Sequence, residues 1–241
     1  MSRRSIQVIA PIDSAVGAAP IHREIPTFAL LGASNVTLGW RSIVARCRAV
    51  AARLDGRKGE EARVPPIRVI GAHGLGRSYG TDSRFLFRSL SSILECELWE
   101  LLDRSAESAA PRYALVTDVG NDIAYGVEPA HLLSWVDEAV SRLRDRGYRV
   151  VLTGLPIDSL LRVSRLRFLT VRTALFPFHR IRQETVMERA REVQWGIERL
   201  ARTRDVSLAT LRGEWYGIDP IHIRLRCRTR AWARILERWG G

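Results

Sequence analysis

The sequence predicts an α/β domain in which helices cover both faces of a parallel sheet. Five short apolar runs, each suited to a buried strand, alternate with longer segments that have helical spacing. Strands that alternate with helices in this way are typical of parallel sheets. The runs are almost continuously apolar, which indicates that both faces of the sheet are buried.

The residues at the ends of these segments set their expected bounds. The expected strands are residues 27–31, 67–70, 113–117, 149–153 and 206–211. The expected helices are residues 38–54, 83–102, 129–146, 184–204 and 225–239. Gly32 ends the first strand, and Thr37 is placed to cap the helix after it. Pro129 suits the first turn of a helix, and Gly147 suits its end.

The composition is that of a globular protein with a strong arginine bias. The formal net charge of +12 would suit a nucleic-acid partner, but Lys58 is the single lysine among 38 basic residues. An arginine bias of this kind reflects a GC-rich genome more often than a binding surface, and the arginines are spread along the chain. No specific nucleic acid is therefore expected, and an arginine-rich nucleotide or nucleic-acid binder is the least favoured alternative.

The ends of the chain and its cysteines bear on domain organisation and location. Residues 1–25 are expected to form a partly disordered arm, and residues 26–241 a single domain. Pro11 and Asp13 interrupt the apolar stretch that an export signal after Arg3-Arg4 would need. No apolar run is long enough to span a membrane. Three widely spaced cysteines favour free, mostly buried thiols and a cytoplasmic location.

Polar residues follow several of the predicted strands, where the ligand site of a parallel sheet lies. Ser34 follows the first strand at the start of a helix, where the helix dipole favours developing negative charge. A serine needs a neighbouring base to become a good nucleophile. Asp219 and His222 follow the last strand, and their spacing lets the aspartate fix the tautomer of the histidine. These residues predict a nucleophile, a base and an orienting acid.

The same loops offer donors for an oxyanion. Asn121, after the third strand, carries a side-chain amide, and Gly76, after the second, offers an unobstructed backbone N–H. The N–H of Ser34 is the third candidate. No metal site is expected, because the remaining histidines lack metal-ligand spacing with nearby acids.

Taken together, these motifs resemble the sequence blocks of the SGNH (GDSL-like) hydrolases, over residues 28–222. FALLGASN matches the first block, VGND the third and DPIH the DxxH block, while GAHGLGRS lies where the glycine of the second block belongs. Gly76 is the chosen glycine of that loop, with Gly71 and Gly74 as alternatives.

The resemblance implies a flavodoxin-like three-layer α/β/α sandwich with a five-stranded parallel sheet. It also implies hydrolysis of a carboxylic ester, acetyl or longer acyl, through a Ser34–His222–Asp219 triad and an acyl-enzyme. The oxyanion hole would consist of Ser34, Gly76 and Asn121. A small or lipid-like ester would be the substrate, and no cofactor would be needed.

Two departures from the family pattern keep a second interpretation open. Ala33 stands where the first block has aspartate, and Val119 stands where the third block has glycine. A catalytically impaired protein that binds a ligand or a partner is therefore the alternative. The loop 71–78 also resembles a phosphate loop, but Arg77 occupies the place of its lysine.

An arginine-rich insert at residues 159–183 lies outside the core pattern. It combines six arginines with several leucines and phenylalanines and contains no acidic residue. A packed helix with solvated arginines would explain it. The alternative is a cap that binds an acyl chain or rests on an anionic membrane surface.

Overall fold

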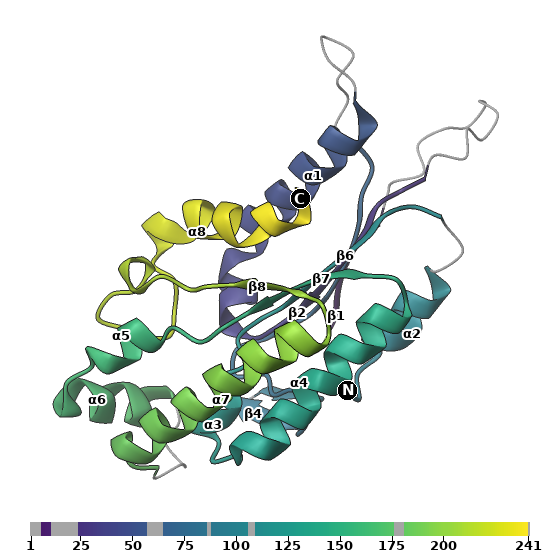
Figure 1. Cartoon of the computed structure of the whole chain (residues 1–241). Helices are drawn as coiled ribbons and strands as arrows, with labels where there is room; N and C mark the ends of the chain where they lie inside the picture. Colours follow the sequence, from purple (N-terminus) through teal and green to yellow (C-terminus); the bar gives the residue numbers. More distant parts are fainter. Residues whose placement is uncertain are drawn as a thin grey trace.

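A six-stranded sheet lies at the centre of the fold (Figure 1). The computed structural model describes residues 6–10, 24–56, 65–85, 88–105, 109–175 and 181–240. In spatial order the strands are Ile6–Ile9 (β1), Arg68–Ala72 (β3), Thr27–Leu31 (β2), Arg112–Val116 (β6), Arg149–Thr153 (β7) and Ser207–Ala209 (β8). The five strands other than β1 are parallel to one another. Numbered along the chain, the five parallel strands have the order 2-1-3-4-5, so the predicted flavodoxin-like sheet is confirmed.

Strand β1 is the one strand of this sheet that the sequence analysis did not expect. It pairs antiparallel with β3, with Ile6 opposite Ala72 and Ile9 opposite Val69. These four residues are therefore tied to the sheet, whereas an untethered arm was expected here. The rest of the expected arm, residues 1–5 and 11–23, lies outside the described residues.

Helices cover both faces of the sheet (Figure 1). On one face lie Ser34–Asp55 (α1) and Arg228–Ile235 (α8). On the other lie Leu98–Arg104 (α2), Pro129–Asp145 (α4) and Gln183–Thr203 (α7). Each layer packs on its own apolar core, and the two cores share the buried strands. Gly39 lets α8 approach α1, because a Cβ at this position would lie 2.1 Å from the indole nitrogen of Trp232.

Several expected elements have other bounds in the structure: the expected strand 206–211 is only Ser207–Ala209, and the expected helix 225–239 is α8 between two 3₁₀ turns. Helix α1 begins at Ser34, one turn before the expected start, and Thr37 is therefore inside the helix. Residues 83–102 do not form one helix: Ser83–Phe85 (β4) and Arg88–Leu90 (β5) form a hairpin, and α2 begins only at Leu98. The N–H groups of Ile93 and Leu94 bond to the carbonyls of Ser78 and Tyr79, which prevents a helix there.

Two short helices account for most of the described part of the insert. Ile157–Leu161 (α5) follows β7, and Arg165–Leu175 (α6) leads toward α7. A four-residue helix, Asn121–Ala124 (α3), follows β6. Three 3₁₀ turns, Gly213–Trp215, Leu225–Cys227 and Leu236–Gly240, complete the C-terminal region. Among the described residues, no helix is long and apolar enough to cross a membrane.

Candidate active site

The polar residues that the sequence analysis selected gather at the carboxyl ends of the parallel strands. Ser34 is the first residue of α1, directly after the loop that ends β2, and is 6% exposed. Asp219 and His222 lie in the loop between β8 and α8. The sheet order places β2 beside β6 and β3, so the loops after these three strands meet at one edge.

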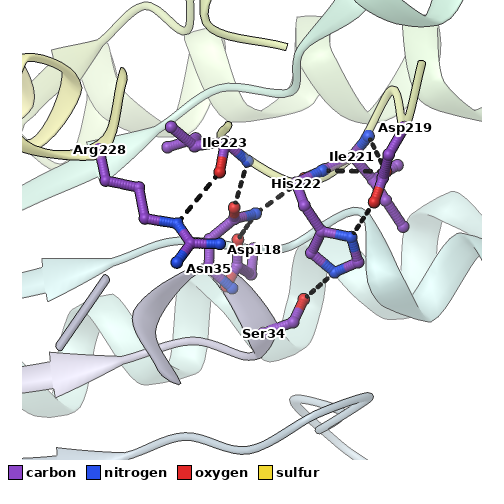
Figure 2. A network of polar contacts seen from close by, with 8 residues as sticks. All are labelled: Ser34, Asn35, Asp118, Asp219, Ile221, His222, Ile223 and Arg228. Carbon is purple, nitrogen blue, oxygen red and sulfur yellow. Dashed lines mark hydrogen bonds and ion pairs between the residues drawn. The ribbon is translucent and has the colours of Figure 1, made fainter. Parts of the chain in front are cut away.

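Ser34, His222 and Asp219 form a continuous chain of hydrogen bonds (Figure 2). The Oγ atom of Ser34 lies 2.8 Å from Nε2 of His222. On the other side of the ring, Nδ1 of His222 lies 2.5 Å from Oδ2 of Asp219. A protonated Nδ1 leaves Nε2 free to accept the proton of the serine hydroxyl, which is the tautomer that a general base requires.

The backbone of the same loop holds the Asp219 carboxylate. Its Oδ1 atom accepts hydrogen bonds from the N–H groups of Ile221 and His222, at 3.0 and 3.2 Å. Partial burial raises the pKa of Asp219, but the hydrogen bond and charge of His222 and these N–H groups outweigh burial and hold that pKa below its ordinary value. The carboxylate is therefore ionised and fixed in orientation beside the ring.

Asp118 organises the start of α1, and the sequence analysis did not select it. Its Oδ2 atom accepts hydrogen bonds from the N–H groups of Ala33 and Asn35, each at 2.9 Å, and from Val36 at 3.4 Å. The N–H of Ser34 is not among these donors. A carboxylate is favoured at this position because the first N–H groups of a helix have no partners within the helix.

Asn35 connects this carboxylate to the loop of His222 (Figure 2). Its amide nitrogen donates to Oδ1 of Asp118 and to the carbonyl of Ile221, both at 2.8 Å. Its amide oxygen accepts the N–H of Ile223, also at 2.8 Å. Asn35 thus binds the residue before His222 and the residue after it, and this fixes the distance between the histidine loop and α1.

The sequence held one indirect signal for an acceptor such as Asp118 and none for Asn35. Ala33 has no side chain that could cap α1, so another residue has to supply the acceptor. Asp118 lies near the start of the loop after β6. It adopts a left-handed backbone with φ 60°, which aspartate tolerates better than most residues. The first departure from the family pattern, Ala33, thus coincides with a carboxylate supplied by a different loop.

The predicted oxyanion donors lie in two further loops. Asn121 is the first residue of α3, and its Nδ2 atom is buried without a hydrogen-bond partner among the described residues. A buried donor without a partner costs free energy unless a ligand supplies the acceptor. Gly76 is buried in the loop after β3 with φ 71°, and its carbonyl accepts the hydroxyl of Tyr125.

The alternative glycines of that loop have packing roles. A Cβ at Gly71 would lie 2.7 Å from the ring of Trp40, and one at Gly74 would lie 2.4 Å from Leu90. These close contacts explain why glycine occupies both positions, so neither glycine needs to be an oxyanion donor. Gly76 stays the predicted donor.

Asp122 has a structural role. It is fully buried, and it accepts hydrogen bonds from the hydroxyl of Ser78 and the N–H of Tyr79. Burial raises the pKa of Asp122 to about 6, although these two donors partly counteract burial. The residue ties the glycine-rich loop to α3 and thereby holds Gly76 and Asn121 in neighbouring loops.

The glycine-rich loop does not present its arginine to solvent. The side chain of Arg77 is fully buried, and it donates to the carbonyl of His73. A phosphate loop needs its basic residue at the surface of the site, so the resemblance to such a loop is not supported. Among the described residues, no group of three or more His, Cys, Asp or Glu side chains is arranged to hold a metal ion.

An apolar pocket adjoins the site. Its wall includes Asn121 and three residues of the hydrogen-bond network around Ser34 and His222, namely Asn35, Asp118 and Ile221. The rest of the wall comes from α3, from the loop after β7, from α5 and α7, and from residues 211 and 216. Its volume is about 100 Å³.

Solved structures of low sequence similarity share this fold. One is Est24, a carbohydrate acetylesterase from Sinorhizobium meliloti, with 15% identity and a TM-score of 0.55 over 89% of this chain and 98% of that chain. Another is a member of the lipolytic protein G-D-S-L family from Veillonella parvula, with 13% identity and a TM-score of 0.51 over 88% of this chain and 96% of that chain. No family model matches the chain, and no curated protein matches it. At these identities the likeness establishes the fold, which is the three-layer sandwich of the G-D-S-L lipolytic proteins.

Proposed function

We propose that this protein is a serine hydrolase that cleaves carboxylic esters. The observation that carries the proposal is the chain of hydrogen bonds from Ser34 through His222 to Asp219, at 2.8 and 2.5 Å. A serine hydroxyl in contact with an oriented imidazole is the arrangement that nucleophilic acyl transfer needs. The fold that this protein shares with the esterase and lipolytic structures described above is consistent with this chemistry.

In the proposed mechanism, the first half of the reaction forms an acyl-enzyme. The Oγ atom of Ser34 attacks the ester carbonyl while Nε2 of His222 takes its proton. Asp219 holds the ring and stabilises the imidazolium. The tetrahedral oxyanion accepts hydrogen bonds from the N–H groups of Ser34 and Gly76 and from Nδ2 of Asn121. The carbon–oxygen bond to the alcohol then breaks, and His222 protonates the leaving alkoxide.

Water completes the cycle. His222 takes a proton from a water molecule, which attacks the acyl carbon. The bond to Ser34 Oγ breaks, the carboxylic acid leaves, and the serine recovers its proton from His222. The N–H of Ser34 suits the oxyanion role, because Asp118 accepts the N–H groups of Ala33, Asn35 and Val36 and leaves this one out.

The first test is covalent labelling with a fluorophosphonate probe, followed by peptide mapping. We expect labelling of the wild type at Ser34, none in Ser34→Ala, and strongly slowed labelling in His222→Ala. Ser42→Ala, in the same helix, is the matched control and should label like the wild type. Absence of labelling in folded protein would reject the hydrolase and favour a protein that binds without catalysis.

Asn121→Ala tests the oxyanion hole separately from the nucleophile. Removing one such donor costs on the order of 100-fold or more in kcat, because the donor acts mainly in the transition state. We expect this loss with KM nearly unchanged, in steady-state assays with a short-chain p-nitrophenyl ester. A loss below tenfold would remove Asn121 from the mechanism.

A further inference from the structure

The apolar pocket beside the site defines which part of an ester it receives. Buried apolar side chains line its interior, among them Val119, Ile123 and Ala190. Leu155, Leu160 and Val186 add further apolar surface. Among the described residues of the wall there is no lysine or arginine, and Asp118 is the one acidic residue. Such a wall suits an uncharged hydrocarbon group and offers little to a sugar or a phosphate.

The pocket wall lies on the acyl side of the proposed reaction centre. Asn121, whose amide nitrogen would hold the carbonyl oxygen, belongs to the wall, whereas Ser34 and His222 lie outside it. The leaving alcohol has to lie next to His222, because this residue protonates it. An ester held by Asn121 and Ser34 therefore directs its acyl chain, not its alcohol, toward the pocket.

The size of the pocket limits the length of that chain. An apolar cavity of about 150 Å³ accepts a benzene ring, with its six carbon atoms. By the same measure, a pocket of about 100 Å³ suits a chain of roughly four carbon atoms. Val119 and Gly120 both contribute to the wall. Val119, the second departure from the family pattern, thus lies where it can shape an acyl site.

We infer that the protein prefers esters of short linear fatty acids, of about four to six carbons, and that this pocket selects them. The inference rests on the proposed function, because it assumes an ester carbonyl at Ser34. Leu160 is the specificity-determining position, since it enters the pocket from α5 at the start of the insert. Its neighbour Leu161 is 53% exposed and lies outside the wall, so it offers a matched control.

The test measures kcat/KM for p-nitrophenyl esters with acyl chains of two, four, six, eight and twelve carbons. We expect the wild type to be most active on the chains of four and six carbons. Each methylene in a hydrophobic pocket is worth roughly 10- to 200-fold in discrimination. Leu160→Trp should therefore lower the butyrate-to-acetate ratio at least tenfold, and Leu160→Ala should move the optimum to longer chains. Leu161→Trp and Leu161→Ala should keep the wild-type profile.

Further measurements keep the outcomes distinct. For acetate esters of alcohols of increasing length, kcat/KM should depend less on the length of the alcohol than it depends on acyl length in the p-nitrophenyl series. A flat acyl profile, a dependence on the alcohol instead, or equal shifts in the Leu160 and Leu161 variants would overturn the inference while Ser34 still reacts with the fluorophosphonate. Failure of both labelling and hydrolysis in folded wild type would instead reject the proposed function. Thermal unfolding of each variant identifies any that does not fold, and Leu160→Ala then serves in place of Leu160→Trp.

Discussion

At the residue scale, the proposed nucleophile Ser34 depends on a carboxylate that is distant from it in the sequence. Helix α1 has no capping side chain of its own, because Ala33 occupies the position before Ser34. Asp118 supplies the acceptor from the loop after β6 and also binds the amide of Asn35. Through Asn35, the same carboxylate is connected to the backbone on either side of His222. Asp118 is therefore a positioning residue for both the serine and the histidine.

Asp118→Asn is the substitution that tests this role. An asparagine can keep the left-handed backbone. Its side chain, however, replaces one carboxylate oxygen with an NH2 group, and this group would face another donor, either the N–H groups of α1 or the amide of Asn35. We expect a loss of about 1–3 kcal/mol in the free energy of unfolding, because buried donors lose their acceptor. We also expect the rate of fluorophosphonate labelling at Ser34 to fall at least tenfold in protein that is still folded.

Asp205→Asn provides the control for the backbone conformation. Asp205 also has a left-handed backbone, with φ 49°, but it is exposed and far along the chain, after α7. Its substitution should change neither labelling nor stability. A wild-type labelling rate in folded Asp118→Asn would show that Asp118 only stabilises the fold.

The sequence was informative about residues whose role follows from local spacing. The DxxH spacing predicted the contact between Asp219 and His222, and the strand-to-helix junction predicted the place of Ser34. Asp118 and Asn35 could not be assigned in this way. Their partners are as many as 188 positions away, and such contacts depend on the register of β2 against β6 and on the path of the last loop.

At the element scale, the buried strands were more predictable than the segments between them. The runs 27–31 and 149–153 match β2 and β7 in full, because continuous apolar sequence between turn residues has few other uses. The expected helix at 83–102 is wrong over most of its length. There, backbone groups are satisfied by the glycine-rich loop, a long-range pairing that helical spacing of side chains cannot reveal.

The insert presents leucines and arginines together to solvent. Leu166 is 77% exposed and Leu169 is 40% exposed on α6, and Arg162 and Arg165 are exposed beside them. The packed helix with solvated arginines that could explain this segment would bury its leucines, and these two are not buried. Leucine with arginine and no acid is the combination that binds to the interface of an anionic bilayer. Leu160 and Val186, on the two flanking helices, line the apolar pocket beside the site.

We expect the protein to float with vesicles that contain anionic lipid at low salt and to stay in solution with neutral vesicles. The double substitution Leu166→Ser and Leu169→Ser should abolish flotation, because the apolar contribution to binding is lost. Leu54→Ser, on α1, is the control for an exposed leucine elsewhere, since Leu54 is 49% exposed. Equal flotation of both variants, or none by the wild type, would exclude a membrane role for this face.

At the scale of the whole molecule, the position of the site follows from the strand order. The chain reverses direction across the sheet between β3, at one side of β2, and β6, at the other. At this point the loops diverge and leave a crevice, which is where ligands bind in open α/β sheets. Ser34 follows the strand in the middle, and the loops after its two neighbours carry Gly76 and Asn121. The region of the site follows from the strand order alone and was therefore predictable, although its hydrogen bonds were not.

Two buried titratable groups should make the stability of the whole molecule depend on pH in opposite ways. Burial, and then the charge of Arg77, lower the pKa of His73 from 6.5 to about 4. His73 therefore contributes stability above pH 6.5 that is lost as the pH falls toward 4. The pKa of Asp122 is raised by burial from 3.8 to about 6. Its contribution is fully present below pH 3.8 and is lost as the pH rises through about 6.

Urea unfolding at pH 7, 6, 5 and 4 separates the two contributions. His73→Phe keeps a ring against Trp40, which lies 4.8 Å from the imidazole, but removes the titrating group. The loss of stability on acidification should then be smaller than in the wild type by up to roughly 3 kcal/mol, at about 1.4 kcal/mol per pKa unit. Asp122→Asn should instead make that loss larger, because the variant lacks the group that gains stability on protonation. His131→Phe, at an exposed position of α4, should leave the slope unchanged. Each of these two variants shares every other titrating group with the wild type. If the free energy of unfolding depends on pH equally in the wild type, His73→Phe and Asp122→Asn, neither group couples to folding.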